Sequence, residues 1–405
     1  MILAVAIIYF GFFLFLTYKN FKTALGLFIL LLPSYFIRFN IGPLPTTILE
    51  LSFGAVFLVW LIRYFKKDWE EIKIFFKRNQ FFTWCLVLFL ISSVVGIFIS
   101  SQIIKSLGIW RAYFLEPILF FILLIGRHKE FKKDDLIWCL SLSTISVSVV
   151  AVLQKLSGEP ILTSLVKADL QGRATSFFTS PNAVGLYVAP ILPLILYGFT
   201  DKSKSKYYWL ILTLAVLAIA VSLSKGAVAA LVVACVLSVF LFGYKKIGSA
   251  LLVASFIAII LFSSIHQNLL FQNRSGQNRL ALWGYTKNFL LKDKKNFIFG
   301  AGISQFFIKI QKPVNNFKKI EPLIYPHNLL LNFWSEIGIL GMLSFLGFYI
   351  SGLKKSRDIF IENKFFGIAL LSVLVVFMVH GLVDVPYFKN DLSFLWWILL
   401  AIIII

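Results

Sequence analysis

The chain has 405 residues, of which 59% are hydrophobic and only 14% charged, and its mean hydropathy is +0.88. This composition excludes an ordinary water-soluble domain, because apolar stretches near twenty residues, long enough to cross the ~30 Å hydrocarbon core of a bilayer, recur throughout. The net charge of +21 does not indicate nucleic-acid binding, since the basic residues gather in short connections between apolar stretches, as in cytoplasmic loops. We therefore expect an all-α, polytopic transmembrane helical bundle with membrane lipids, and no nucleic acid, as partners.

The apolar stretches predict 12–13 spans in one integral membrane domain over residues 1–405. They lie near 2–18, 23–37, 46–64, 81–100, 108–126, 135–154, 183–199, 207–222, 226–243, 247–264, 329–350, 365–383 and 391–405. The first stretch has no basic residue ahead of it, so we expect a retained span and no cleaved signal peptide.

Basic residues of the short connections predict the orientation of the spans. They are concentrated in the odd-numbered connections, which should therefore face the cytoplasm. This places the amino terminus, 155–182, 223–225 and the large loop 265–328 on the outer side.

The large loop 265–328 ends where an apolar helix is expected over 329–350. Asn328, Asn332 and Glu336 recur at four-residue spacing, so they form a polar stripe on this helix. Because a carboxylate in a membrane is costly, Glu336 should face protein or a wet cavity and not lipid.

Few charged residues are predicted on the outer side, so each is a candidate for function. Arg173, Lys225, Arg279 and His327 would face the same compartment, and such a set of cations with an imidazole suits a bound diphosphate. Each residue also has an ordinary interpretation: a solvated loop arginine, a lysine extending to the interface, or a histidine at a helix start.

Charged and titratable residues inside predicted spans are expected to contact other helices. His380 should hydrogen-bond a neighbouring helix. Arg111 and Glu116 are five residues apart on one span, so we expect them not to face each other and to pair with other helices.

Motifs of soluble enzymes are absent from the sequence. There is no phosphate-binding Gly-x-x-x-x-Gly-Lys-Ser/Thr loop, no Gly-x-Ser-x-Gly elbow and no His-Glu-x-x-His. The outer connection 38–46 carries no acidic pair to hold a divalent ion. We therefore expect neither a metal nor a cofactor, with charge stabilisation supplied by side-chain cations.

Five short sequence blocks follow one another along the chain, beginning at Arg173. They are Arg173-Ala174-x-x-Phe177 with Pro181-Asn182-x-x-Gly185; Ser222-x-Ser224-Lys225-Gly226; Arg279-x-x-x-Trp283 with Gly300-x-Gly302-x-x-x-Phe306; His327-Asn328 with Gly338-Ile339-Leu340-Gly341; and His380-Gly381-Leu382-Val383-Asp384-Val385-Pro386. In this order, with a long loop before the histidine, the blocks resemble the O-antigen ligase and polymerase family, over roughly residues 110 to 400.

The resemblance implies a membrane glycosyltransferase of the C type that moves a glycan from undecaprenyl diphosphate without a metal ion. By its position, His327 matches the family histidine that heads the helix after the outer loop, and Arg279 matches the loop arginine. Lys225 stands where the family has a second arginine, which keeps the charge but loses the bidentate fork. These three are the candidate catalytic residues.

Arg173 and Asn182 match a block that the resemblance assigns to positioning of donor or acceptor, and Asn328 follows the histidine. We take these three as candidate substrate-binding residues.

The expected reaction is an inverting transfer on the outer face of the bacterial cytoplasmic membrane, to a lipid or saccharide hydroxyl. His327 would accept the hydroxyl proton while Arg279 and Lys225 stabilise the departing diphosphate. The sequence leaves open a ligase, a polysaccharide polymerase or a protein oligosaccharyltransferase of the same family. A lipid-glycan flippase or transporter remains the alternative from a different class.

Overall fold

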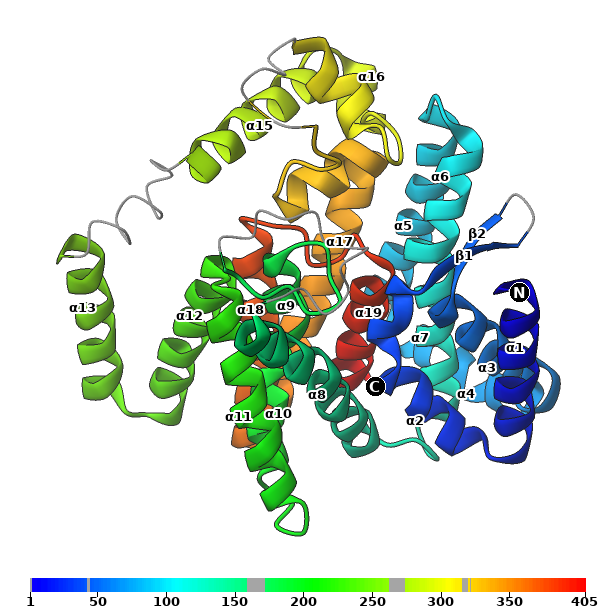
Figure 1. Ribbon diagram of the computed structural model, residues 1–405, viewed down its shortest axis with the longest axis horizontal. Coiled ribbons are helices and arrows are strands. Elements are labelled where there is room, and N and C mark those ends of the chain that lie inside the picture. Colours follow the sequence, from blue (N-terminus) through cyan, green and yellow to red (C-terminus); the bar gives the residue numbers. More distant parts are fainter. Residues whose placement is uncertain (1, 42–43, 159–171, 262–273, 315–319, 321) are drawn as a thin grey trace.

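A computed structural model of the protein describes residues 2–41, 44–158, 172–261, 274–314, 320 and 322–405 (Figure 1). Most of the described chain is helical, which confirms the predicted all-α class. The elements of the first part are α1 (Ile2–Lys19), α2 (Phe21–Leu30), β1 (Arg38–Ile41), β2 (Leu44–Thr47), α3 (Ile48–Arg63), α4 (Phe65–Arg78), α5 (Gln80–Ile99), α6 (Ile103–Trp110), α7 (Glu116–Arg127) and α8 (Lys133–Ser157). Those of the second part are α9 (Pro181–Val188), α10 (Leu192–Gly198), α11 (Ser205–Ser222), α12 (Lys225–Phe242), α13 (Lys245–Leu261), α15 (Arg274–Leu291), α16 (Lys294–Phe299), α17 (Leu329–Glu362), α18 (Lys364–Gly381) and α19 (Asn390–Ile404).

Eight helical segments of the described chain are long and apolar enough to cross a membrane. They are Gln80–Ile99, Ile103–Arg127, Lys133–Ser157, Pro181–Gly198, Ser205–Ser222, Lys225–Phe242, Leu329–Glu362 and Lys364–Gly381. Helices α3 and α4 meet at 95° and make a ninth if counted as one broken span. The spans predicted near 2–18, 23–37 and 391–405 fall on shorter apolar helices, and the one near 247–264 extends beyond the described residues. The protein is thus a multi-pass membrane protein.

The short strands β1 and β2 form an antiparallel hairpin ahead of α3, the one sheet in the described part of the chain. The hairpin leads directly into a capping box. The Thr47 hydroxyl accepts from the Glu50 N–H at 3.1 Å, and the Glu50 carboxylate accepts from the Thr47 N–H at 3.2 Å. This cap fixes the position of the Glu50 carboxylate at the start of α3.

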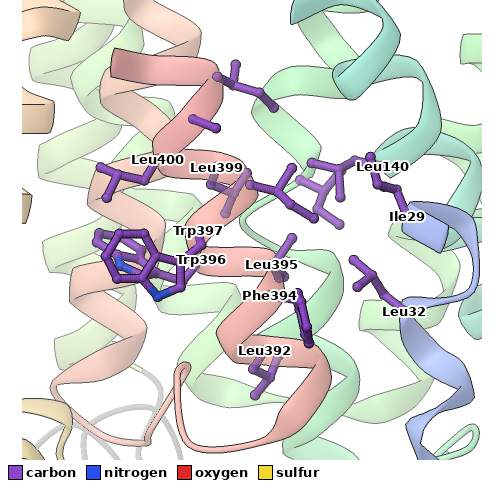
Figure 2. Packing of buried hydrophobic residues seen from close by; sticks show 14 of the residues in the cluster. Ile29, Leu32, Leu140, Leu392, Phe394, Leu395, Trp396, Trp397, Leu399 and Leu400 are labelled. Carbon is purple, nitrogen blue, oxygen red and sulfur yellow. The ribbon is translucent and has the colours of Figure 1, made fainter. Parts of the chain in front are cut away.

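Helix α19 lies in the interior of the bundle (red in Figure 1), and all of its residues are buried. The Trp397 ring packs 5.1 Å from Phe121 and 5.2 Å from Phe348. Figure 2 shows Phe394 and Leu395 on a different side of the helix, facing the chain around Leu32. A helix that is apolar all round is expected at such a buried position. Its burial fixes the segment 382–389 that precedes it.

The segment from Ile103 to Arg127 contains one π-helical turn, Arg111–Leu115. The wider π-turn brings residues five apart into register, which an α-helix does not. Arg111 Nε therefore lies 3.2 Å from Glu116 Oε1, while Arg111 Nη2 lies 2.8 Å from Glu50 Oε2 on α3. The prediction that Arg111 and Glu116 do not face each other was wrong for this reason. The predicted pairing with another helix is confirmed for Arg111, through Glu50, but not for Glu116.

Helix α17 begins at Leu329 and is interrupted at Gly338, which has a φ of +77°. A Cβ at Gly338 would collide with the backbone carbonyl of Ile298, so only glycine allows this close approach. Glu336, just before the break, is 5% exposed, which confirms that it faces protein. The break lets the end of α16 lie directly against α17.

Candidate active site

The predicted site residues gather around one carboxylate, Asp384, in the segment between α18 and α19. His327 Nδ1 lies 3.2 Å from Asp384 Oδ1, and the Val385 N–H donates to the same oxygen at 3.0 Å. Asn182 Nδ2 donates to the other oxygen at 3.3 Å. Asp384 is only 3% exposed, so its acceptor capacity is used mainly by the protein.

The Asp384 carboxyl is held in its ionised form. Burial disfavours the charge, but the interactions with His327, His380 and Arg279 outweigh burial and keep the pKa of the Asp384 carboxyl well below its usual range. An ionised carboxylate beside Nδ1 favours the imidazole tautomer that donates from Nδ1. The Nε2 atom of His327 is then left as a proton acceptor.

Contacts on both sides hold His327 in a strained backbone conformation. Its φ is +53°, in the left-handed region that few non-glycine residues occupy. The Pro326 carbonyl before it accepts from Trp283 Nε1 at 3.0 Å. Asn328 after it caps α17 and donates from Nδ2 to the Leu382 carbonyl at 3.0 Å. Such imposed strain is concentrated at functional sites.

Arg173 ties the chain before α9 to the hairpin between α11 and α12. Its Nε donates to the Ser222 carbonyl at 3.0 Å, and Nη2 donates to the Leu223 carbonyl at 3.2 Å. Nη2 also donates to Asn182 Oδ1 at 2.9 Å. Burial and the charge of Arg279 lower the pKa of Arg173. Arg173 therefore stabilises the hairpin and orients Asn182, besides placing positive charge near the site.

Arg279, on α15, carries a donor for which the described part of the chain offers no acceptor. Its charge acts on both Asp384 and Arg173, so the guanidinium is within electrostatic range of both. Its Nε is buried, and no described atom accepts a hydrogen bond from it. A buried N–H without a partner is costly, so this donor is suited to a bound anion.

Lys225 is the first residue of α12 and its side chain is exposed. The residues around it contact the same cluster: the Leu223 carbonyl binds Arg173, and Gly226 lies against the His380 ring. A Cβ at Gly226 would lie 2.7 Å from Cδ2 of His380, so the start of α12 is packed directly on α18. This packing places the backbone at the start of α12, including Lys225, close to His380.

Of the predicted site residues, Asn182 and His327 contact Asp384 directly. Arg173 contacts Asn182, Asn328 contacts the Leu382 carbonyl, and the charge of Arg279 acts on Asp384. Lys225 is linked to this cluster through the packing of Gly226 on His380. The sequence missed the role of Asp384, although it stood in the last motif block. A buried carboxylate between apolar segments is costly unless it is paired with a donor or a cation. His327 and His380 were available as partners, so the need to pair Asp384 was the signal that could have identified its role.

The arrangement joins a proton acceptor to cations that can bind an anion. Imidazole suits general-base work near neutral pH, and preorganised cations stabilise negative charge that develops on a leaving group. Within the described ranges, no three His, Cys, Asp or Glu side chains are close enough to hold a metal ion.

Comparison with known proteins finds a family match within the second half of the chain. Residues 210–346 match the family model described as O-antigen ligase. The matched range includes Lys225, Arg279, His327 and Asn328, and it ends before Asp384. None of the curated proteins matches the sequence. The match confirms the resemblance that the sequence motifs carry.

Proposed function

Because residues 210–346 match the O-antigen ligase family model, we propose that the chain is a membrane glycosyltransferase that transfers a glycan from undecaprenyl diphosphate to an acceptor hydroxyl. The multi-pass helical fold agrees with this type of enzyme. The observation that carries the proposal is the contact between His327 and the buried, ionised Asp384 beside the unpartnered donor of Arg279.

His327 acts as the general base of the transfer. Its Nδ1 donates to Asp384, so Nε2 accepts the proton of the acceptor hydroxyl as that oxygen attacks the anomeric carbon. The new bond joins the acceptor oxygen to the anomeric carbon. The bond from that carbon to the diphosphate oxygen breaks on the opposite face, so the configuration inverts.

The cations hold the donor and stabilise its leaving group. Undecaprenyl diphosphate departs with the bonding electron pair, so negative charge grows on its bridging oxygen. Arg279 offers a planar fork with a free N–H, and Lys225 offers a compact point charge. Loss of one preorganised donor of this kind costs ~3–4 kcal/mol of barrier. These side-chain charges stabilise the leaving diphosphate, as a divalent ion does in metal-dependent transferases.

The outer face of the cytoplasmic membrane is the side we assign to the reaction. The distribution of basic residues supports it, because His327, Arg279, Lys225 and Arg173 all belong to connections on the side opposite the basic loops. A ligase and a polymerase share this donor chemistry and differ in the acceptor.

The His327→Ala variant tests the proposal. Purified protein receives a synthetic undecaprenyl-diphosphate-linked glycan as donor and the lipid fraction of the native membrane as acceptor. Release of undecaprenyl diphosphate and the glycosylated product are measured by mass spectrometry. Loss of a general base predicts a fall in kcat of about 10²–10⁴-fold, with donor binding retained.

His128→Ala is the matched control. His128 lies after α7, where Nδ1 is 2.8 Å from the Ile125 carbonyl, and it has no place in the cluster. Its variant should keep full turnover. Near-normal turnover of a correctly folded His327→Ala protein would remove the imidazole from the chemistry and with it the proposed mechanism.

A further inference from the structure

A large cavity lies in the amino-terminal half of the molecule, between the β1–β2 hairpin, α3 and α6. Its volume is about 1240 Å³, above the ~300–1,000 Å³ of typical small-molecule sites. Three cations line it, Arg38, Lys105 and Arg111, against the single carboxylate Glu50. None of these residues belongs to the cluster around Asp384, so the cavity needs an explanation of its own.

The charge of Arg111 is already compensated, but the charges of the other two cations are not. Arg111 pairs with Glu50 at 2.8 Å and Glu116 at 3.2 Å. No ion pair within 4.0 Å joins Arg38 or Lys105 to any carboxylate of the described chain. The cavity therefore carries two positive charges that favour an anionic occupant.

Asp391 lies close behind this wall without neutralising it. Asp391 is fully buried at the start of α19, and no ion pair of the described chain joins it to Arg38. Arg38 therefore remains able to bind a further anion.

The cavity wall also carries groups that suit a saccharide. Asn390 lines it and is 4% exposed; its Nδ2 donates to Glu50 at 2.8 Å, while its Oδ1 has no described partner. A buried acceptor of this kind gains from a hydroxyl donor. The rings of Tyr35, Phe39 and Tyr113 form part of the same wall, and aromatic faces pack well against the apolar face of a pyranose ring.

Aromatic residues connect this cavity to the imidazole site. The Tyr113 carbonyl in the cavity wall accepts from the Tyr387 hydroxyl at 2.7 Å, and Tyr387 belongs to the segment that carries Asp384. Tyr325 in turn packs its ring 5.0 Å from the His327 ring. The hydrogen bond between Tyr113 and Tyr387 therefore joins the cavity wall to the segment that carries Asp384.

We propose that this cavity is the acceptor site and that it takes an anionic saccharide, such as a phosphorylated sugar. The inference rests on the proposed glycosyl transfer. The acceptor's negative charge lies between Arg38 and Lys105, a hydroxyl donates to Asn390 Oδ1, and the sugar approaches His327 from the side away from the donor cations.

Photo-crosslinking of the full-length protein in phosphatidylcholine nanodiscs tests the proposal. The probes are maltotriose 6-phosphate carrying a diazirine and the same diazirine-tagged maltotriose without phosphate, and labelled peptides are mapped by mass spectrometry. The phosphorylated probe should label the peptides around Arg38 and around Ile103–Trp110 about tenfold more strongly, since a charged contact discriminates by that order.

The R38Q/K105Q double variant should reduce labelling by the phosphorylated probe to the level of the neutral one. Lys292→Gln, an exposed lysine between α15 and α16, is the matched control and should change nothing. Equal labelling by the two probes, labelling confined to other regions, or full competition by phosphatidylglycerol vesicles would overturn the assignment, the last because it would show a lipid headgroup site.

Steady-state kinetics separate this inference from the proposed function. The double variant should raise KM for the acceptor with kcat nearly unchanged, because it removes binding and no proton transfer. Charge-selective labelling in a protein that transfers no glycan would overturn the transferase proposal and leave an anionic-saccharide site. Transfer that is intact, with no labelling and no change in KM, would overturn the cavity assignment alone.

Discussion

Replacing Asp384 by Asn removes one charge at the centre of the site with almost no change in volume. The carboxylate contacts His327 Nδ1 at 3.2 Å and is 3% exposed. A hydrogen bond to a charged group contributes ~1.5–3 kcal/mol. The His327 side chain is 20% exposed and the contact is long, so we take the lower end of this energy range. That energy corresponds to a fall of about tenfold in kcat. Any reversal of the imidazole tautomer adds to this loss.

The assay is steady-state transfer from a lipid-linked donor, with kcat and KM resolved. Asp384 touches no substrate in the mechanism, so it is a positioning residue, and kcat should fall by at least about tenfold while KM for the donor changes little. Asp134→Asn, at an exposed position on α8, is the matched control. A kcat within twofold of the parent's, in a protein that unfolds at the same temperature, would refute the role of Asp384.

Stability against pH gives a second readout of the same carboxylate. The folded pKa of Asp384 lies below its unfolded value of ~3.9. Its stabilisation is therefore fully present above the unfolded pKa and is lost as pH falls through the folded pKa. Thermal unfolding of Asp384→Asn should differ from the parent above about pH 5, and the difference should shrink below about pH 4. A difference that grows as pH falls below about 4 would contradict the assigned ionisation.

Three further variants extend the test to the cations and the helix packing. Arg279→Gln should lower kcat by about 10²-fold or more, and Arg279→Lys should recover part of the loss, measured as release of undecaprenyl diphosphate. Lys225→Gln should lower kcat/KM for the donor by about tenfold, whereas Lys225→Arg should match or exceed the parent; equal activity of the Gln variant would remove Lys225 from the site. Gly226→Ala places a methyl group 2.7 Å from the His380 ring and should lower stability by ~1–3 kcal/mol, visible as a lower unfolding temperature.

The class of fold was predictable because hydropathy and segment length follow directly from residue type. The sequence did not distinguish helices that face lipid from those surrounded by protein. Helix α19 is the clear case: it reads as a membrane span, yet every residue of it is buried. The π-turn Arg111–Leu115 was equally invisible, since no local pattern marks it, and it reversed the expected relation of Arg111 and Glu116.

The candidate site residues were predicted from the motif blocks in which they stand. Their mutual geometry was not predictable, since it depends on contacts between segments far apart in the chain. Arg173 illustrates this: its guanidinium binds the carbonyls of Ser222 and Leu223, a structural task that its motif does not reveal. The contact between His327 and Asp384 likewise joins the chain just before α17 to the chain just after α18.

One short segment fixes the catalytic cluster and the proposed acceptor cavity relative to each other. It carries Asp384 at its start and leads into α19, whose first residue, Asn390, lines the cavity. Trp397 Nε1 donates to the Tyr387 hydroxyl at 3.2 Å, and that hydroxyl donates to the Tyr113 carbonyl at 2.7 Å. The segment is thus tied to the core on both sides. A transfer between two bound substrates gains most when both are held at fixed distance and angle. In the proposed reaction, the buried helix α19 would supply this rigidity by anchoring the segment between the two sites.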